Sequence, residues 1–140
     1  MRWLAWALLT AVFWGVGPIF AKLGLGKADP LIGLSIRTFG VAFALLVISL
    51  ATGNLGSLTK VPLLTAAALL AEGVFASLLG HFAYFNALKT GPASIVAAVT
   101  ASFPLVTLVV AVAVLRESVT VGRAIGAVMV VLGLVFLRLF

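Results

Sequence analysis

The stretch Trp3–Leu23, WLAWALLTAVFWGVGPIFAKL, contains one charged side chain, Lys22, which stands near its end. A helix of about 20 apolar residues is long enough to cross the hydrocarbon core of a bilayer. Further stretches of this kind occupy residues 30–51, 62–88, 92–115 and 119–139. We therefore expect an all-α integral membrane protein with five transmembrane helices in a single domain, residues 1–140.

The composition argues against a soluble protein. Of the 140 residues, 64% are hydrophobic and 9% are charged, which lies far outside the range of soluble domains. A soluble helical protein would keep a polar face on each helix, whereas apolar residues here cover every face. The first stretch also resembles a secretory signal, but its apolar run is longer than that of a signal peptide and four more follow it. We interpret it as the first transmembrane helix.

The Lys and Arg residues are shared evenly between the two faces of the membrane. Lys and Arg near the helix ends set the orientation of a membrane protein. With Arg37 set aside because it falls inside a helix, each face carries four. An even count gives no orienting bias, so we expect insertion both ways up and pairing with an inverted copy. The face of the N-terminus carries Arg2, Lys60, Arg116 and Arg123, and the other face carries Lys22, Lys27, Lys89 and Arg138.

The same residues indicate a lipid environment and no enzyme. The net charge is +6, but the basic residues stand singly at segment ends, so they indicate lipid headgroups as partners and no nucleic acid. One histidine, three acids and no cysteine leave little for metal binding or acid–base catalysis. We expect no metal, no cofactor and no catalytic site.

Glycine and proline residues interrupt two of the expected helices. Gly15, Gly17 and Pro18 fall inside the first stretch, and Pro104 falls inside the fourth. Such interruptions occur in transporters where neighbouring helices or a wet cavity satisfy the freed backbone groups. The alternative is a packing kink.

Small residues mark one face of the last stretch. Gly122 and Gly126 form a GxxxG pair near its start. This spacing allows two helices to approach closely, either within the monomer or between two copies.

Glu72 is the ionisable residue that argues most directly for function. It lies about nine residues into the stretch 62–88, near mid-bilayer, where an ionisable group costs roughly 2.5–3.5 kcal/mol on insertion scales. Burial at that depth favours the neutral form. A carboxyl group of this kind can exchange a proton for a cationic or polar substrate. The alternative is a neutral acid that is hydrogen-bonded to a neighbouring helix.

Further polar side chains in the same stretch are candidates for substrate contact. At about 100° per residue, His81 lies on the opposite face from Glu72. Tyr84 shares the face of His81, and Asn86 lies near the face of Glu72. For His81 alone, an interhelical hydrogen bond is the favoured interpretation.

Two residues in the first two stretches complete the candidate set. Arg37 lies two turns inside the stretch 30–51, where its side chain either extends to the headgroups or reaches a carbonyl or carboxylate inside the bundle. Trp14 adjoins the glycine and proline residues of the first stretch, in a position to line a cavity.

A set of short motifs follows in order along the chain: Phe13-Trp14-Gly15, Lys22, Asp29-Pro30, Arg37, Ala87-Leu88-Lys89, Pro104, Leu115-Arg116-Glu117, Ile125-Gly126-Ala127 and Gly133. In this order they resemble the EamA domain of the drug/metabolite transporter superfamily, in its single-domain bacterial and archaeal branch. The resemblance covers essentially the whole chain, and each motif is weak alone while the ordered set is specific. Glu72 has no counterpart in the family pattern, so its proposed role depends on burial alone.

The resemblance implies that this chain is one half of a ten-helix, inverted-repeat transporter, because most members carry two five-helix halves of opposite orientation. It further implies a secondary transporter of small metabolites or amino acids in the cell membrane, working by alternating access as a homodimer. The even charge count makes the second half an inverted copy. Two alternatives remain: a non-transporting subunit of a hetero-oligomeric transporter, or a channel or lipid-flipping component.

Overall fold

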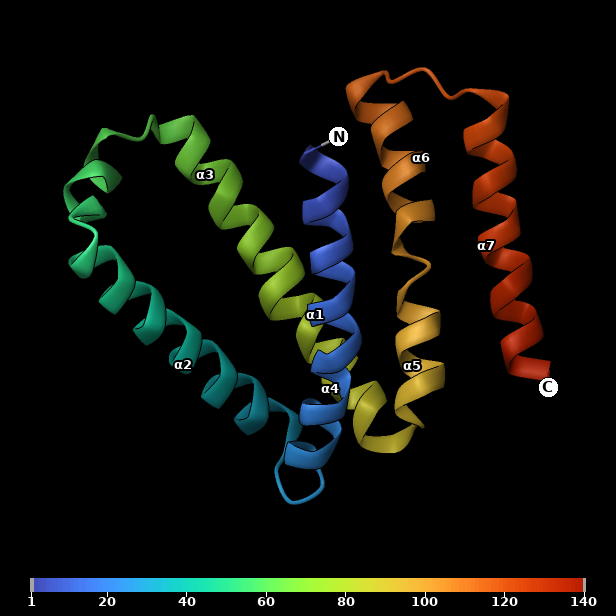
Figure 1. Cartoon of the computed structure of the whole chain (residues 1–140), viewed down its shortest axis with the longest axis horizontal. Helices are drawn as coiled ribbons and strands as arrows, with labels where there is room; N and C mark the ends of the chain where they lie inside the picture. Colours follow the sequence, from blue (N-terminus) through green and yellow to red (C-terminus); the bar gives the residue numbers. More distant parts are fainter. Residues whose placement is uncertain (1, 140) are drawn as a thin grey trace. The chain divides into compact units, whose positions relative to one another are not determined.

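The computed structural model describes residues 2–139, with side chains for residues 3–137. Within residues 2–139 the chain is helical and contains no strand. Four helical stretches are long and apolar enough to cross a membrane, and Val121–Leu137 is a shorter apolar helix. The elements are α1 (Arg2–Leu25), α2 (Pro30–Ala51), the 3₁₀-helix η1 (Asn54–Lys60), α3 (Leu63–Glu72), the π-helix η2 (Gly73–Gly80), α4 (His81–Thr90), α5 (Ala93–Thr100), α6 (Phe103–Leu115) and α7 (Val121–Leu139) (Figure 1).

The chain divides into two compact units, which are described separately. Unit 1 consists of Met1–Pro18 and Gly91–Phe140, and unit 2 consists of Ile19–Thr90. In unit 1, α7 packs against α5. In unit 2, α2 packs against α4, and η2 packs against α3 and α4.

Local capping explains where α2 and α7 begin. The Asp29 carboxylate accepts a hydrogen bond of 2.9 Å from the Leu31 amide, and Pro30 occupies the first turn, where its missing N–H costs nothing. Asp29 is therefore the N-cap of α2. At the start of α7, the Thr120 hydroxyl accepts a bond of 3.4 Å from the Arg123 amide. Thr120 therefore supplies the side-chain cap at this end.

The core of unit 2 lies where the ends of α1 and α4 meet the start of α2. The buried apolar side chains are Leu25, Leu34, Phe85 and Leu88, and Leu88 has no exposed surface. A methyl group added at Gly33 would lie 2.9 Å from Leu25 Cδ2, so the buried Leu25 side chain would have to shift to accommodate it. From this core, α2 and the stretch α3–η2–α4 diverge as two arms (Figure 1).

The first helix is continuous where an interruption was expected. α1 runs from Arg2 to Leu25 as one α-helix with Pro18 inside it. The Gly15, Gly17 and Pro18 interruption is therefore absent, and the residues remain helical. Pro18 removes a single backbone donor, which leaves the Trp14 carbonyl without its i+4 partner, and membrane helices tolerate this loss.

The fourth apolar stretch is interrupted beside Pro104. α5 ends at Thr100, and α6 begins at Phe103. Pro104 has no N–H for the Thr100 carbonyl, and the Leu105 amide donates to the Ser102 carbonyl at 2.9 Å. The Thr100 carbonyl therefore lacks its helical donor at the break.

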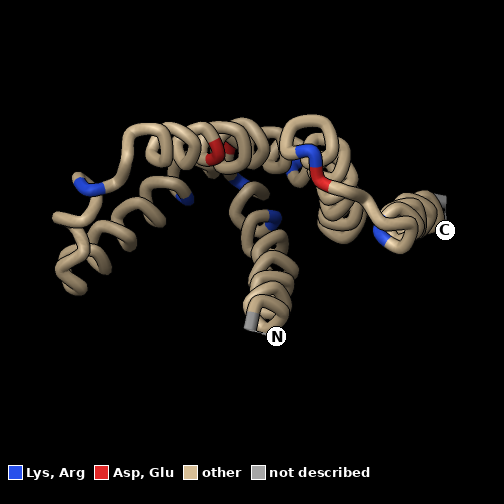
Figure 2. The backbone as a smooth tube through the Cα atoms, turned by 90° about the horizontal axis from the view of Figure 1, so that it is seen from above, with Lys and Arg blue, Asp and Glu red and all other residues tan. Residues whose placement is uncertain are grey.

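Most apolar side chains outside the core of unit 2 are exposed. Leu63 and Leu64 are 85% and 83% exposed. Charged residues are few, and long parts of the helices carry none (Figure 2). Such surfaces require lipid or another protein chain as their neighbour, which is the situation of a multi-pass membrane protein.

Candidate functional site

The less exposed side of the stretch Leu63–Thr90 carries polar side chains. Gly73, Ser77, His81 and Tyr84 are partly buried, while most of their neighbours in sequence are exposed. Phe85, which is buried against the core of unit 2, continues the same side. This stripe therefore marks the side of the arm that packs towards the interior of unit 2.

His81 directly follows the π-helix and bonds back to it through both its ring and its backbone amide. The His81 amide donates to the Ala76 carbonyl, and the ring atom Nδ1 lies 2.9 Å from the same oxygen. Because a carbonyl oxygen only accepts, Nδ1 carries the proton in this bond. In the neutral ring, Nε2 is then the acceptor nitrogen. His81 thus bonds within its own helix, and the structure shows no interhelical hydrogen bond to it among the described residues.

Aromatic contacts hold the His81 ring in place. Its centroid lies 6.3 Å from that of Tyr84 and 6.3 Å from that of Phe85, both edge to face. Since Phe85 belongs to the buried core, the ring is fixed to the packed end of unit 2. The sequence placed His81 and Tyr84 on one face, and the contact bears this out.

Glu72 ends α3, and the π-helix begins directly after it. Each π turn holds about one residue more than an α turn, so each residue advances by roughly 80° and not 100°. Over Gly73–Gly80 this difference removes most of the 180° expected between Glu72 and His81. The opposite-face prediction does not hold, because it assumed a regular α-helix. The Glu72 side chain is exposed and forms no hydrogen bond or ion pair within residues 2–139.

Arg37 lies on the face of α2 that packs, one turn earlier, in the core of unit 2. It follows Gly33 by four residues and the buried Leu34 by three, and these spacings share one helix face. Its side chain is exposed. In the described part of the chain, the guanidinium group forms neither a hydrogen bond nor an ion pair, so neither expected carbonyl nor carboxylate partner is present.

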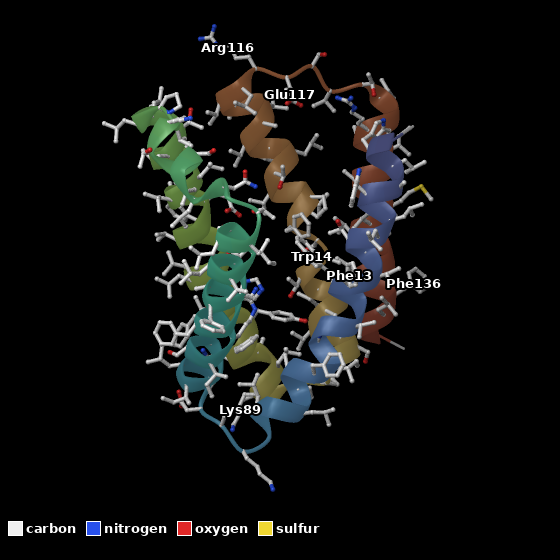
Figure 3. The ribbon with its side chains drawn as sticks, turned by 60° about the vertical axis from the view of Figure 1, so that its left-hand side comes forward. Phe13, Trp14, Lys89, Arg116, Glu117 and Phe136 are labelled. Atoms are coloured by element: carbon white, nitrogen blue, oxygen red, sulfur yellow. The ribbon has the colours of Figure 1, made fainter. Side chains whose placement is uncertain are left out.

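Two lysines join the ends of α1 and α4 in a way that sequence reasoning missed. Lys22 Nζ donates to the Leu88 carbonyl at 2.5 Å. Lys89 Nζ donates to the carbonyls of Leu25 and Ala28, each at 2.7 Å, beside the turn between α1 and α2 (Figure 3). We call Lys22 and Lys89 the lysine clasp: Lys22 bonds to a carbonyl near the end of α4, and Lys89 bonds to the last carbonyl of α1 and to one in the turn after it. Their positions near helix ends were the available signal, but the sequence suggested lipid headgroups as their partners.

Trp14 lies beside the break in the fourth apolar stretch, within unit 1. Its ring centroid is 6.1 Å from that of Phe103, the first residue of α6, at an interplanar angle of 59°. Phe13 and Trp14 are adjacent on α1 (Figure 3). Within unit 1, the structure thus brings Trp14 together with the Pro104 region.

The remaining predicted residues have local roles or none. The Asn86 amide nitrogen donates to the Phe82 carbonyl at 2.8 Å, one turn back in the same helix. At Gly122 and Gly126, an added methyl group would meet nothing within 4 Å. Packing inside the protomer therefore does not require these two glycines in the described residues.

Two open hollows lie in unit 1. One, of about 370 Å³, lies between α5 and α7, and its lining includes Ser94 and Ala98. The other, of about 290 Å³, lies between α6 and α7 and includes Pro104, Arg123 and Gly126. Neither is enclosed. Among the described residues, no group of three or more His, Cys, Asp or Glu could hold a metal ion.

Comparison with known proteins identifies relatives over the whole length. The EamA-like transporter family matches residues 1–139. An uncharacterized protein of Methanocaldococcus jannaschii is 30% identical over 94% of this chain and 93% of its own length. An uncharacterized transporter in the cobO 3′ region of a Sinorhizobium species is 29% identical over 99% and 97%. An uncharacterized transporter of Clostridium kluyveri is 27% identical over 93% of this chain but 42% of its own length. No solved structure matches.

Proposed function

Because the chain belongs to the EamA-like transporter family, we propose that it is a secondary transporter of small metabolites or amino acids that works by alternating access as an antiparallel homodimer. The proposed site of action is the cell membrane. α7 has 19 residues, about 28 Å of helix, which approaches the thickness of the hydrocarbon core. We include it as the fifth transmembrane helix.

The length of one relative carries the dimer proposal. The C. kluyveri transporter aligns with this chain over 42% of its length, so a second segment of the same size fits within it. A chain with one such segment would obtain the second from another copy. The two hollows of unit 1 are open on the protomer, and a second copy would supply the missing walls.

The charge distribution supports an inverted arrangement of the two copies. Four Lys or Arg residues are assigned to each face, with Arg37 set aside, so neither orientation is favoured at insertion. An antiparallel pair then reproduces, with two chains, the inverted repeat that many transporters build into one chain.

Glu72 is the proposed coupling residue. It is exposed on the protomer, within a membrane-spanning stretch and without an ion-pair partner among the described residues. Intramembrane ionisable groups of this kind commonly lie on ion or proton pathways. His81 and Tyr84 lie further along the same stretch, and we propose that the three side chains contribute to substrate or proton passage. Within unit 1, Trp14 and the break at Pro104 are proposed to line an apolar cavity.

Cysteine labelling tests the arrangement directly, because the chain has no native cysteine. Ser57→Cys, between α2 and α3, and Pro92→Cys, between α4 and α5, probe opposite faces without changing the charge count. Labelling of each to about half with an impermeant maleimide in intact cells is the expected result of dual insertion. Labelling at one position alone would contradict the antiparallel dimer.

Transport is tested with the purified chain in liposomes. We expect saturable counterflow of at least one member of a radiolabelled amino-acid panel, with protein-free liposomes as the control. Flux that rises linearly with concentration would indicate a channel. Flux that requires a second, different membrane protein would indicate a non-transporting subunit.

A further inference from the structure

Unit 2 contains two intramembrane charges of opposite sign that have no partner in the protomer. Arg37 and Glu72 are both exposed and both lie inside membrane-spanning stretches. Neither forms an ion pair within residues 2–139. Ionisable side chains at such depths usually pair with one another or with backbone carbonyls, because an isolated charge in hydrocarbon is costly. The arrangement therefore calls for a partner from outside the protomer.

The two residues lie too far apart along the arms of unit 2 to pair within one chain. Both distances can be counted from the core, where α2 begins at Pro30 and α4 ends at Thr90. Arg37 follows Pro30 by seven residues, about 10 Å of helix, whereas Glu72 precedes Thr90 by 18 residues, roughly 25 Å. The arms also diverge from the core (Figure 1). A gap of roughly 15 Å along the arms separates the two charges.

In an inverted second copy, Arg37 comes to nearly the same depth in the membrane as Glu72 of the first copy. Glu72 follows Leu63, at the other end of its arm, by nine residues, about 13 Å of helix below that membrane face. Inversion brings the start of the partner's α2 to the same face. Arg37 of the partner subunit then lies about 10 Å below it, so the two charges differ in depth by about 3 Å. An arginine side chain spans that difference easily.

We propose that Glu72 of each protomer forms an ion pair with Arg37 of the partner subunit. A two-fold axis in the membrane plane makes the contact reciprocal, so the dimer contains two such pairs. This inference rests on the antiparallel homodimer proposed above. It means that the proposed coupling carboxylate is completed only by the second copy, and that the protomer alone lacks a functional site.

Charge exchange between two differently tagged chains tests the pairing. Glu72→Arg alone or Arg37→Glu alone places like charges together at both contacts of a homodimer. Each should reduce the dimer fraction in mild detergent about tenfold or more, because each buried pair becomes a repulsion. Co-expression of the two variants forms a mixed dimer in which opposite charges meet at both contacts. Pull-down through one tag should recover the other chain at the wild-type level.

The controls distinguish this pairing from an ion pair within the protomer and from a nonspecific effect of charge. Glu117→Arg removes a carboxylate from the loop between α6 and α7, and its co-expression with Arg37→Glu should give no recovery. If Glu72→Arg with Arg37→Glu in one chain restores dimers while co-expression does not, the pair lies within the protomer and the inference fails. If both single variants dimerise as the wild type does, the inference fails while the homodimer stands. A wild-type monomer would overturn both.

A crosslinking measurement does not depend on the charge variants folding. Arg37→Cys on one tagged chain and Glu72→Cys on the other are joined by a short bis-maleimide in membranes. We expect a crosslinked dimer that carries both tags. Equal yield from Arg37→Cys paired with Leu70→Cys, an exposed position two residues before Glu72, would contradict the specific contact.

Discussion

Removal of the Lys89 ammonium group should loosen the joined ends of α1 and α4. Lys89→Met keeps a long apolar stem and deletes two charge-assisted hydrogen bonds of 2.7 Å, to the carbonyls of Leu25 and Ala28. Bonds to a charged donor contribute about 1.5–3 kcal/mol each. The bond to Leu25 is partly buried and counts nearly in full, whereas the bond to Ala28 is exposed and counts for little. We expect a loss of about 2 kcal/mol in the free energy of unfolding, roughly a 30-fold shift in the folded fraction.

The assay is unfolding of the purified chain in mild-detergent micelles by titration with sodium dodecyl sulfate. Far-ultraviolet circular dichroism at 222 nm follows the loss of helix. Lys27→Met is the matched control, because it removes the same charge from the adjacent turn. Lys27 is exposed, and the described part of the chain offers it no hydrogen-bond partner. We expect a change of less than about 0.5 kcal/mol for this control.

Equal destabilisation by Lys89→Met and Lys27→Met would refute the reasoning. It would mean that a general loss of positive charge at this face, and not the bonds across the two helix ends, determines the effect. A loss seen for Lys89→Met alone, with Lys22→Met behaving similarly, would support the lysine clasp as the element that holds the ends of α1 and α4.

Further substitutions test other parts of the structure. Gly33→Ala brings a methyl group to 2.9 Å from a leucine side chain and should lower the free energy of unfolding by about 1–3 kcal/mol in the same titration. The control Gly40→Ala, whose added methyl group meets nothing within 4 Å, should be neutral or slightly stabilising. A larger loss of stability for Gly40→Ala than for Gly33→Ala would contradict the close approach at Gly33. Leu88→Ala, at the fully buried position, should cost about 2–5 kcal/mol, and a cost as low as that of Leu70→Ala, which is exposed, would remove it from the core. Pro104→Ala restores a helical donor and should slow amide hydrogen exchange across residues 101–105; unchanged exchange would show that the break has another cause.

Local signals in the sequence predicted the position of α2. α2 occupies residues 30–51, as expected. Both signals for it, the length of the apolar run and Asp29-Pro30 at its start, lie within the helix or directly beside it. That Arg37 and Glu72 lie inside long apolar stretches follows equally from counting along the sequence. The transporter family could be recognised because its motifs keep their order along the chain.

Sequence reasoning failed where the backbone had more than one acceptable conformation. Pro18 was expected to interrupt α1, but a membrane helix tolerates the loss of one backbone hydrogen bond. Gly73–Gly80 was expected to be α-helical, but it forms a π-helix, which moves His81 and Glu72 out of their predicted relation. The choice between backbone hydrogen bonds to residue i−4 and to residue i−5 depends on packing along the arm, and no local pattern in residues 73–80 predicts it.

Every segment that spans the hydrocarbon core must be long and apolar and must satisfy its own backbone hydrogen bonds. Length, apolar character and charge placement by themselves therefore determined that this chain is a helical membrane protein. Tertiary structure alone decided which groups meet. Lys22 bonds to a carbonyl 66 positions away in sequence, and Lys89 to one 64 positions away. Trp14 lies against Phe103. Such contacts exist only where helices distant in the chain end or cross together, because a hydrogen bond or ring contact requires a separation of a few ångströms, which spacing along one segment does not specify.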